Sequence, residues 1–325
     1  MKTPYGCLLF STMILTSGPA WAQAPSPAFP TKPIFWVLPS LPGGSGDVYV
    51  RLYTQVITAN VGWKFVMDYK PGNGATIGTT YVAKAAPDGH TLLLAASTFT
   101  STPLVQRDLP YDSVKSFAPI SLLGNQTNAL LVSAKFPAKN LKEYVAYAKA
   151  NPGKLNFANN GVGGYAHLVS AALHHQMGIT STYINYKAGP QIATALISGE
   201  ADATITGIAG YLPHVKAGKM HMIGLAGIKR APNLPDLPTL AEQGATGFDY
   251  AGWFGVLAPA RTPASTVRAI NAEIVKATKD PELLEKLSPV TIVTSSTPEE
   301  FSELIARQIA RWQQLVKDTN LNLTE

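Results

Sequence analysis

A loop rich in glycine and proline near residue 40 constrains this sequence most, because it joins a stretch typical of a buried strand to one typical of an amphipathic helix. The strand is expected over 34–38, and Val48, Leu52 and Val56 recur at the spacing of one helix face. In the connecting residues 38–47, glycines permit sharp turns and bring backbone N–H groups close to a ligand. The positive end of the helix dipole faces the same place. The pattern predicts either an anion-binding loop or an ordinary turn between a strand and a helix.

The first 22 residues have the parts of a secretory signal peptide in the expected order. Lys2 precedes an apolar stretch over 7–15, and Ala20 and Ala22 form the small-residue pattern of a cleavage site. We expect cleavage after Ala22, because the apolar stretch is far shorter than the roughly 18 residues that a membrane anchor needs. Cys7 is the only cysteine. A cleaved chain would therefore have no disulfide, no thiolate zinc site and no cysteine nucleophile.

The cleaved chain would be long enough for two domains. Removal of residues 1–22 from the 325 would leave 303 and would lower the formal charge from +6 to +5, because Lys2 is lost. A hydrophobic fraction of 46% and a charged fraction of 14% favour packed cores over disorder. Lys and Arg are scattered, with no basic run interleaved with aromatic residues. Nucleic-acid binding is therefore disfavoured.

Short apolar stretches alternate with amphipathic ones along the rest of the chain, which is typical of α/β folds with mostly parallel sheets. The last helix is the best defined, since Thr297, Pro298 and Glu300 supply a cap, a first-turn proline and a capping-box carboxylate. The proline-rich segment 231–238 is predicted to be a stiff surface connection. Further strands are expected over 64–67, 91–95, 120–123, 130–132, 154–157, 182–185, 203–206 and 222–225.

Eight loop motifs occur in an order and spacing that resemble the Bug-type substrate-binding proteins of tripartite tricarboxylate transporters. Each motif alone is weak, but together they are specific and cover essentially the whole chain after the signal peptide. The first contains the pattern Pro-Gly-Gly-x-x-Asp. The motifs lie at 34–47, 70–78, 83–93, 109–112, 150–156, 186–190, 212–219 and 253–259.

The resemblance implies an α/β protein with the two-lobed type II periplasmic binding protein fold. Each lobe would be a mostly parallel sheet flanked by helices, and the lobes would close on a ligand like a flytrap. The chain is expected to cross between the lobes near 124–128 and near 250–253. The implied division is a signal peptide over 1–22, lobe 1 over 28–124 plus 251–325, and lobe 2 over 125–250.

The resemblance also implies a function. The protein would be a periplasmic, monomeric, non-catalytic receptor that binds a small organic carboxylate, aromatic or aliphatic, and delivers it to membrane permease subunits. It would need no cofactor and no metal. Two alternatives stay open: a subunit that presents its ligand to a sensor histidine kinase, and a secreted hydrolase that acts in the same cleft.

In that family, backbone amides, hydroxyls and ordered waters from both lobes hold the ligand carboxylate. Neutral donors bind an anion at a smaller desolvation cost than a buried fixed charge, and they permit release. By position, the resemblance assigns ligand binding to Pro42, Gly43, Gly44, Ser45, Asp47, Ser97 and Thr98 in lobe 1, and to Gly163, Gly164, Tyr165, His167, Gly189, Pro190 and Thr206 in lobe 2.

Two of these positions depart from the family pattern. Tyr165 stands where serine is frequent, so a ring could stack on an aromatic ligand or could pack at a helix start. Thr206 stands where members that bind amino acids often have aspartate, which disfavours an amino-acid ligand.

The enzyme motifs are incomplete. Ser45 lacks the G-x-S-x-G pattern of hydrolases, and His174 and His175 lack the carboxylate of a H-E-x-x-H metal set. Asp47 has no catalytic partner in sequence reach, so a role at the helix start or in orienting the ligand is favoured over that of a general base.

Overall fold

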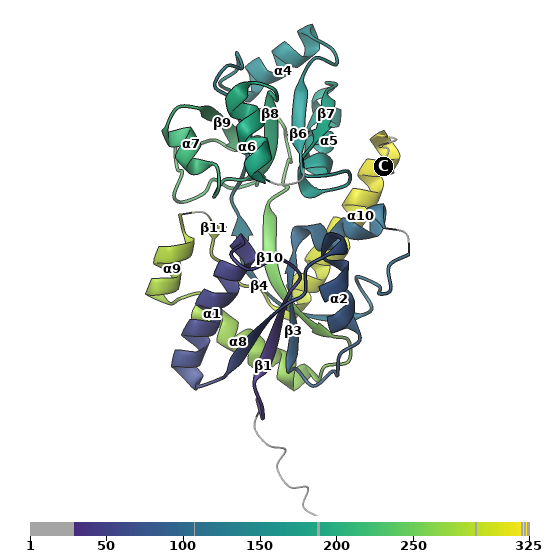
Figure 1. The fold of residues 1–325 in the computed structure, drawn as a ribbon, viewed down its shortest axis with the longest axis vertical. Coiled ribbons are helices and arrows are strands. Elements are labelled where there is room, and N and C mark those ends of the chain that lie inside the picture. Colours follow the sequence, from purple (N-terminus) through teal and green to yellow (C-terminus); the bar gives the residue numbers. More distant parts are fainter. Residues whose placement is uncertain are drawn as a thin grey trace, which may run out of the picture.

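The computed structural model describes residues 29–106, 108–186, 189–289, 291–319, 321 and 323, and the predicted signal peptide lies outside them. Figure 1 shows two lobes joined by extended segments, with the C-terminal helix along one side. Each lobe contains one β-sheet with helices packed around it. The expected two-lobed α/β architecture is therefore confirmed.

The sheet of lobe 1 has six strands in the order β11-β4-β10-β3-β1-β2. Strand β1 is parallel to β2 and β3, whereas β10 is antiparallel to β3 and β4. The strands are β1 (Ile34–Leu38), β2 (Phe65–Tyr69), β3 (Thr91–Ala96), β4 (Phe117–Gln126), β10 (Gly252–Pro259) and β11 (Thr291–Ile292). The helical segments that accompany them are α1 (Ser45–Val61), η1 (Asn73–Ala75), α2 (Thr76–Ala83), η2 (Ser97–Thr100), α3 (Thr102–Val105), α8 (Ala264–Ala277), α9 (Pro281–Leu287) and α10 (Pro298–Thr319).

The sheet of lobe 2 has five strands in the order β7-β6-β8-β5-β9. Strand β6 is parallel to β7 and β8, and β5 is antiparallel to β8 and β9. The strands are β5 (Asn128–Ser133), β6 (Asn156–Asn159), β7 (Thr182–Asn185), β8 (Ala203–Gly207) and β9 (Met220–Leu225). The helices are α4 (Leu141–Ala150), α5 (Tyr165–Met177), α6 (Gly189–Ser198) and α7 (Leu212–Lys216).

Both sheets are mixed rather than mostly parallel as the sequence suggested. The antiparallel pairs all involve the strands at the two crossings and their neighbours, β4, β5 and β10. These strands carry the chain out of one lobe and into the other. A chain that leaves lobe 1 through β4 must return in the opposite direction through β10, which places antiparallel pairs in the middle of that sheet.

The two crossings lie in close contact. Strand β4 ends at Gln126 in one sheet and β5 begins at Asn128 in the other, while β10 begins at Gly252. A Cβ atom on Gly252 would lie 2.6 Å from Nδ2 of Asn128 and 2.7 Å from Oε1 of Gln126. A side chain at this point would force the Gln126 and Asn128 side chains of the neighbouring crossing to move.

Helix α10 takes part in the cores of both lobes. Near its start, Phe301 and Ile305 are buried against the sheet of lobe 1. Near its end, Trp312 and Leu315 join the core of lobe 2, where α10 packs beside α5 (Figure 1). The predicted cap is present, since Glu300 N–H donates to Thr297 Oγ1 at 3.1 Å and Thr297 N–H donates to Glu300 Oε2 at 2.8 Å.

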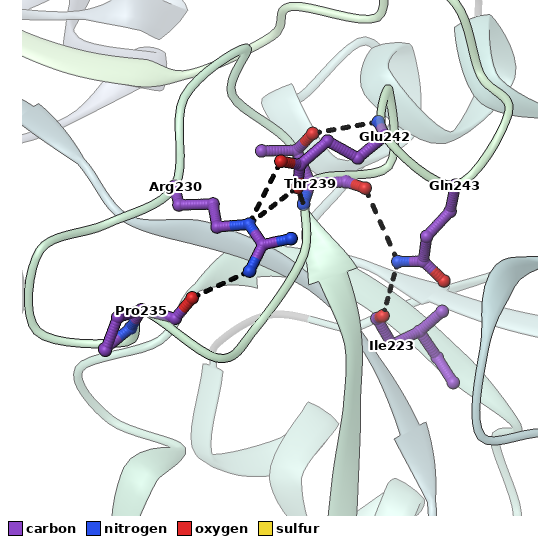
Figure 2. Close-up of polar contacts among 6 residues, drawn as sticks. All are labelled: Ile223, Arg230, Pro235, Thr239, Glu242 and Gln243. Atoms are coloured by element: carbon purple, nitrogen blue, oxygen red, sulfur yellow. Dashed lines mark hydrogen bonds and ion pairs between the residues drawn. The ribbon is translucent and has the colours of Figure 1, made fainter.

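The proline-rich connection after β9 is held on lobe 2 by side chains (Figure 2). Arg230 Nε donates to both carboxylate oxygens of Glu242, at 3.0 and 2.9 Å, and its Nη1 donates to the carbonyl of Pro235 at 2.9 Å. Gln243 Nε2 donates to the carbonyl of Ile223 on β9 at 2.8 Å. These bonds hold the connection on lobe 2 up to the second crossing.

Candidate ligand-binding site

A cavity of about 240 Å³ opens in lobe 1 at the carboxyl ends of β1 and β3. In open α/β sheets, ligands bind at this edge. Its walls come from the opening loop with the start of α1, the segment η1 to α2, the end of β3 with η2 and α3, the loop before β4, and β10. The lining residues are Pro39, Ser40, Gly44, Ser45, Gly46, Gly74, Ala75, Thr79, Leu94, Ala95, Ala96, Thr98, Phe99, Thr102, Tyr111 and Phe254.

Helix α1 begins at this cavity without a side-chain cap. Its N-cap residue is Gly44, with φ −73° and ψ 167°, and no side chain accepts a hydrogen bond from the first turn. Gly43 has φ +85°, a conformation that favours glycine and turns the loop into the helix. The N–H groups at the start of a helix have no partner within it. They are therefore available to an anion in the cavity, with the helix dipole favouring negative charge.

Asp47 is bound to its own loop and helix. Its carboxylate accepts from Gly43 N–H at 2.9 Å and from the Tyr69 hydroxyl at 2.6 Å, and it pairs with Arg51 Nε at 2.9 Å. Burial opposes ionisation, but the bonds from Tyr69, Gly43 and Arg51 outweigh it and hold the pKa of Asp47 below its ordinary value. The ionised side chain fixes the opening loop, which is the helix-start role that the sequence favoured.

The start of α2 adds a second strained loop to the cavity wall. Asn73 and Ala75 have positive φ, at +45° and +76°, although neither is glycine. Such conformations cost about 1–3 kcal/mol and gather at ligand sites. Thr79 Oγ1 donates to the Ala75 carbonyl at 2.9 Å and so supports the turn. This loop was one of the eight family motifs, but its residues were not assigned to the site.

Of the two residues predicted after β3, Thr98 lines the cavity and Ser97 is buried behind it. The turn η2 is fastened to α10, because Thr100 Oγ1 accepts from Trp312 Nε1 at 3.1 Å. Gln308 Oε1 joins the same network by accepting from Trp253 Nε1 at 2.8 Å. The position of Thr98 thus depends on the helix that is buried in both lobes.

The predicted glycine loop of lobe 2 contacts lobe 1. Gly163 has φ +68°, and a Cβ atom there would lie 2.5 Å from Cγ2 of Val105 on α3. Gly163 N–H donates to Nδ1 of His167 at 3.0 Å. Burial lowers the pKa of His167, so the ring is neutral near pH 7 and accepts this bond. His167 packs edge-on against Tyr183 and acts within lobe 2 as the support of the loop.

Tyr165 connects the start of α5 to the second crossing, because its hydroxyl donates to the carbonyl of Tyr250. The side chain is half-buried and packs against the core of lobe 2. Gly164 is the N-cap of α5 and, like Gly44, leaves the helix without a side-chain cap.

The predicted residues Gly189 and Thr206 lie beside Tyr211, which sequence analysis missed. The Tyr211 hydroxyl donates to the carbonyl of Gly189 at 3.2 Å. Burial raises the pKa of Tyr211 to about 12, against a smaller opposing effect of a hydrogen bond with Thr206. Pro190 follows Gly189 in the first turn of α6. Thr206 and the Gly189 carbonyl therefore lie at the Tyr211 hydroxyl, at the end of β8.

The site has few groups suited to acid–base chemistry. Tyr111 is the only titratable side chain on the cavity wall among the described residues, and burial raises its pKa. Within the same part of the chain, no three His, Asp or Glu side chains gather at metal-binding distance. No helix of the described chain is long and apolar enough to span a bilayer. The arrangement is suited to holding an anion by neutral donors.

The family model for the tripartite tricarboxylate transporter family receptor matches residues 50–321. The chain belongs to this family.

The chain is 30% identical to protein BugT of Bordetella pertussis over 95% of this chain and 96% of BugT. Two solved structures resemble it closely. R. palustris Rpa4515 with adipate has a TM-score of 0.80 and 27% identity, covering 91% of this chain and all of that one. MatC from Rhodopseudomonas palustris with bound malate has a TM-score of 0.74 and 28% identity, covering 89% of this chain and all of that one. The resemblance inferred from the eight loops is thus confirmed, and the protein is a receptor of the transporter class.

Proposed function

We propose that this protein binds a small organic carboxylate between its lobes and delivers it to the permease subunits of a tripartite transporter. The observation that carries the proposal is the uncapped start of α1 at Gly44, which faces a cavity at the carboxyl edge of the sheet. Related structures that hold adipate and malate support a carboxylate as the ligand.

The carboxylate would lie against the first-turn N–H groups of α1, with the hydroxyls of Ser45 and Thr98 as further donors. Both hydroxyls lack a hydrogen-bond partner among the described residues. Asp47 would act indirectly, because its three bonds hold Gly43 and the helix start in place. Paired with Arg51, its charge opposes a bound anion less than a lone carboxylate would.

Lobe 2 would cover the ligand. The loop at Gly163 already contacts α3 of lobe 1, and the cluster of Thr206, Gly189 and Tyr211 would supply polar groups from above. Binding groups from both lobes meet only when the lobes rotate together, and the ligand must favour that closed state. Release would follow from opening, because the chain relies on neutral donors in the cavity.

We infer that the chain acts in the periplasm as a monomer after cleavage at Ala22, and that it catalyses no reaction. These inferences rest on the signal-peptide pattern and on the receptor class of the family.

Calorimetric titration of the cleaved protein with adipate, malate and benzoate tests the proposal. At least one acid should bind one to one and raise the melting temperature, since a ligand that binds only the native state stabilises it. Incubation with chromogenic esters tests the hydrolase alternative. Ester turnover that depends on the cavity, or failure of every carboxylate to bind, would overturn the proposal.

A further inference from the structure

The cavity is lined by hydrogen-bond donors on one part of its wall and by rings and aliphatic side chains on the rest. This arrangement indicates which class of ligand the cavity can bind. We propose that the receptor takes an aromatic carboxylate whose ring packs beside Phe99, Tyr111 and Phe254 while its carboxylate meets the start of α1. The inference rests on the proposed function and narrows it from organic acids in general to one class.

The free donors of the cavity are few and come from neighbouring parts of the sheet edge. Ser40 and Ser45 follow β1, and Thr98 follows β3, which is parallel to β1. Their hydroxyls have no partner among the described residues. The carboxyl ends of parallel neighbours lie at the same edge, so these donors and the first turn of α1 serve one anionic group.

Two other hydroxyls on the wall, those of Thr79 and Thr102, already donate hydrogen bonds within the protein. Thr79 Oγ1 donates to the carbonyl of Ala75, and Thr102 Oγ1 donates to the carbonyl of Thr98, each at 2.9 Å. Burial raises the pKa of Tyr111, and the neighbouring Thr76 and Thr79 hydroxyls oppose that rise. No Lys, Arg or His of the described chain lines the cavity. A second carboxylate in this region would lose its water without gaining a donor, which is costly.

The rest of the wall presents fixed rings. Phe99 and Tyr111 lie with ring planes 4° apart, and Phe117 packs edge-on against both. Phe254 packs edge-on against Tyr49 at a centroid distance of 4.8 Å. Rings held by such contacts lose little freedom when a ligand ring packs on them.

The volume suits a ring with a carboxylate attached. A dry cavity of about 150 Å³ lined by apolar side chains takes benzene, and the cavity here measures about 240 Å³. Gly46 lets the start of α1 pack closely on β3 and β10 at the cavity wall, because a Cβ atom there would lie 2.6 Å from Leu94 Cδ2 and 3.4 Å from Phe254 Cε1.

The first test uses the wild-type cleaved protein with benzoate, cyclohexanecarboxylate, adipate and malate in competition calorimetry. Benzoate should bind most tightly and should displace adipate. Binding of adipate or malate that benzoate fails to displace would overturn the aromatic assignment and leave the proposed function standing. Binding of none of the acids, benzoate included, would defeat both.

Two variants locate the ring and the carboxylate separately. Phe254→Leu should weaken benzoate by about 2- to 10-fold, the effect expected for loss of one ring contact, and should change cyclohexanecarboxylate less. Thr98→Val should weaken both acids alike, because it removes a carboxylate donor. Ala59→Val, at an exposed position near the far end of α1, is the control for added bulk. Equal losses for benzoate and cyclohexanecarboxylate in Phe254→Leu would contradict ring recognition, and the wild-type series decides the matter if that variant fails to fold.

Discussion

Gly163 of lobe 2 lies directly against Val105 of lobe 1, so closely that a methyl group on Gly163 would approach Val105 Cγ2 to 2.5 Å. The contact joins the predicted binding loop of one lobe to the short helix that follows Thr98 and the cavity in the other. Replacement of one Cα hydrogen of Gly163 by a methyl group would therefore push the two lobes apart at this contact.

Gly163→Ala should hold the lobes apart and weaken ligand binding. If the closed population falls to about a tenth, the apparent affinity falls about tenfold. The left-handed backbone adds a stability cost of about 1–2 kcal/mol. Gly178→Ala is the matched control, because Gly178 has φ +62° and a Cβ atom there would meet nothing within 4 Å. Both variants should lose stability in urea, but only Gly163→Ala should lose affinity by calorimetry. Equal affinities would show that this contact does not limit closure.

Gly44→Val should obstruct the anion at the start of α1 without unfolding the protein. A Cβ atom on Gly44 would meet only the carbonyl of Leu41 at 3.8 Å, and its φ of −73° suits any residue. Loss of one hydrogen bond to a charged group costs about 1.5–3 kcal/mol, which corresponds to a reduction in affinity of about 10- to 150-fold. Calorimetry with the best acid, beside Ala59→Val, measures the effect. Unchanged affinity would remove this loop from the carboxylate site.

Asp47 should stabilise the fold in a pH-dependent way. Its folded pKa lies below the ordinary value of 3.8, so the stabilisation is fully present well above pH 3.8. As the pH falls through 3.8, the unfolded chain binds the proton first, and the stabilisation is lost as the pH passes the folded pKa. The difference in unfolding free energy between wild type and Asp47→Asn should therefore be equal at pH 7 and pH 6 and smaller at pH 3. Urea titrations at these values measure it, and a difference that does not vary with pH would contradict the ionised bonding scheme.

Amino acids should bind more weakly than their deaminated counterparts. Thr206 and Gly189 lie beside Tyr211, and in the part of the chain that the structure describes no carboxylate bonds to this group to pair with an ammonium. An unpaired buried charge costs several kcal/mol. Titrations should rank 3-phenylpropanoate above phenylalanine, and glutarate above glutamate. The opposite order in both pairs would show that the ammonium group has a partner in the site.

Ligand binding should make the protein more compact. Small-angle scattering of the cleaved chain at saturating acid should give a smaller radius of gyration than the free protein, because the lobes rotate together. Identical profiles would indicate a cleft that is already closed without ligand.

Features set by neighbouring residues could be predicted from sequence. The capping box of Thr297 and Glu300 and the opening loop at Gly44 each depend on a few consecutive positions, and both occur as expected. The ring wall could not be predicted, because Phe99, Tyr111 and Phe254 meet only through the pairing of β10 with β3 and the packing of the loop before β4.

Two residues of the predicted site also have structural contacts that the sequence did not reveal. His167 matched a binding motif, yet its ring supports the Gly163 loop from inside lobe 2. Tyr165 was considered for stacking, and its hydroxyl is bound to the second crossing at Tyr250. Spacing along the chain identifies the loops that surround a site, but the direction of each side chain depends on partners distant in sequence.

Helix α10 sets a mechanical limit on the receptor. One continuous helix is buried in lobe 1 at Phe301 and in lobe 2 at Trp312, so it connects the two lobes rigidly along that side of the molecule. The lobes cannot part along it unless Trp312 slides over α5 or the helix bends. We therefore expect solute to enter on the side away from α10, with the bending stiffness of this one helix limiting how wide the entrance becomes.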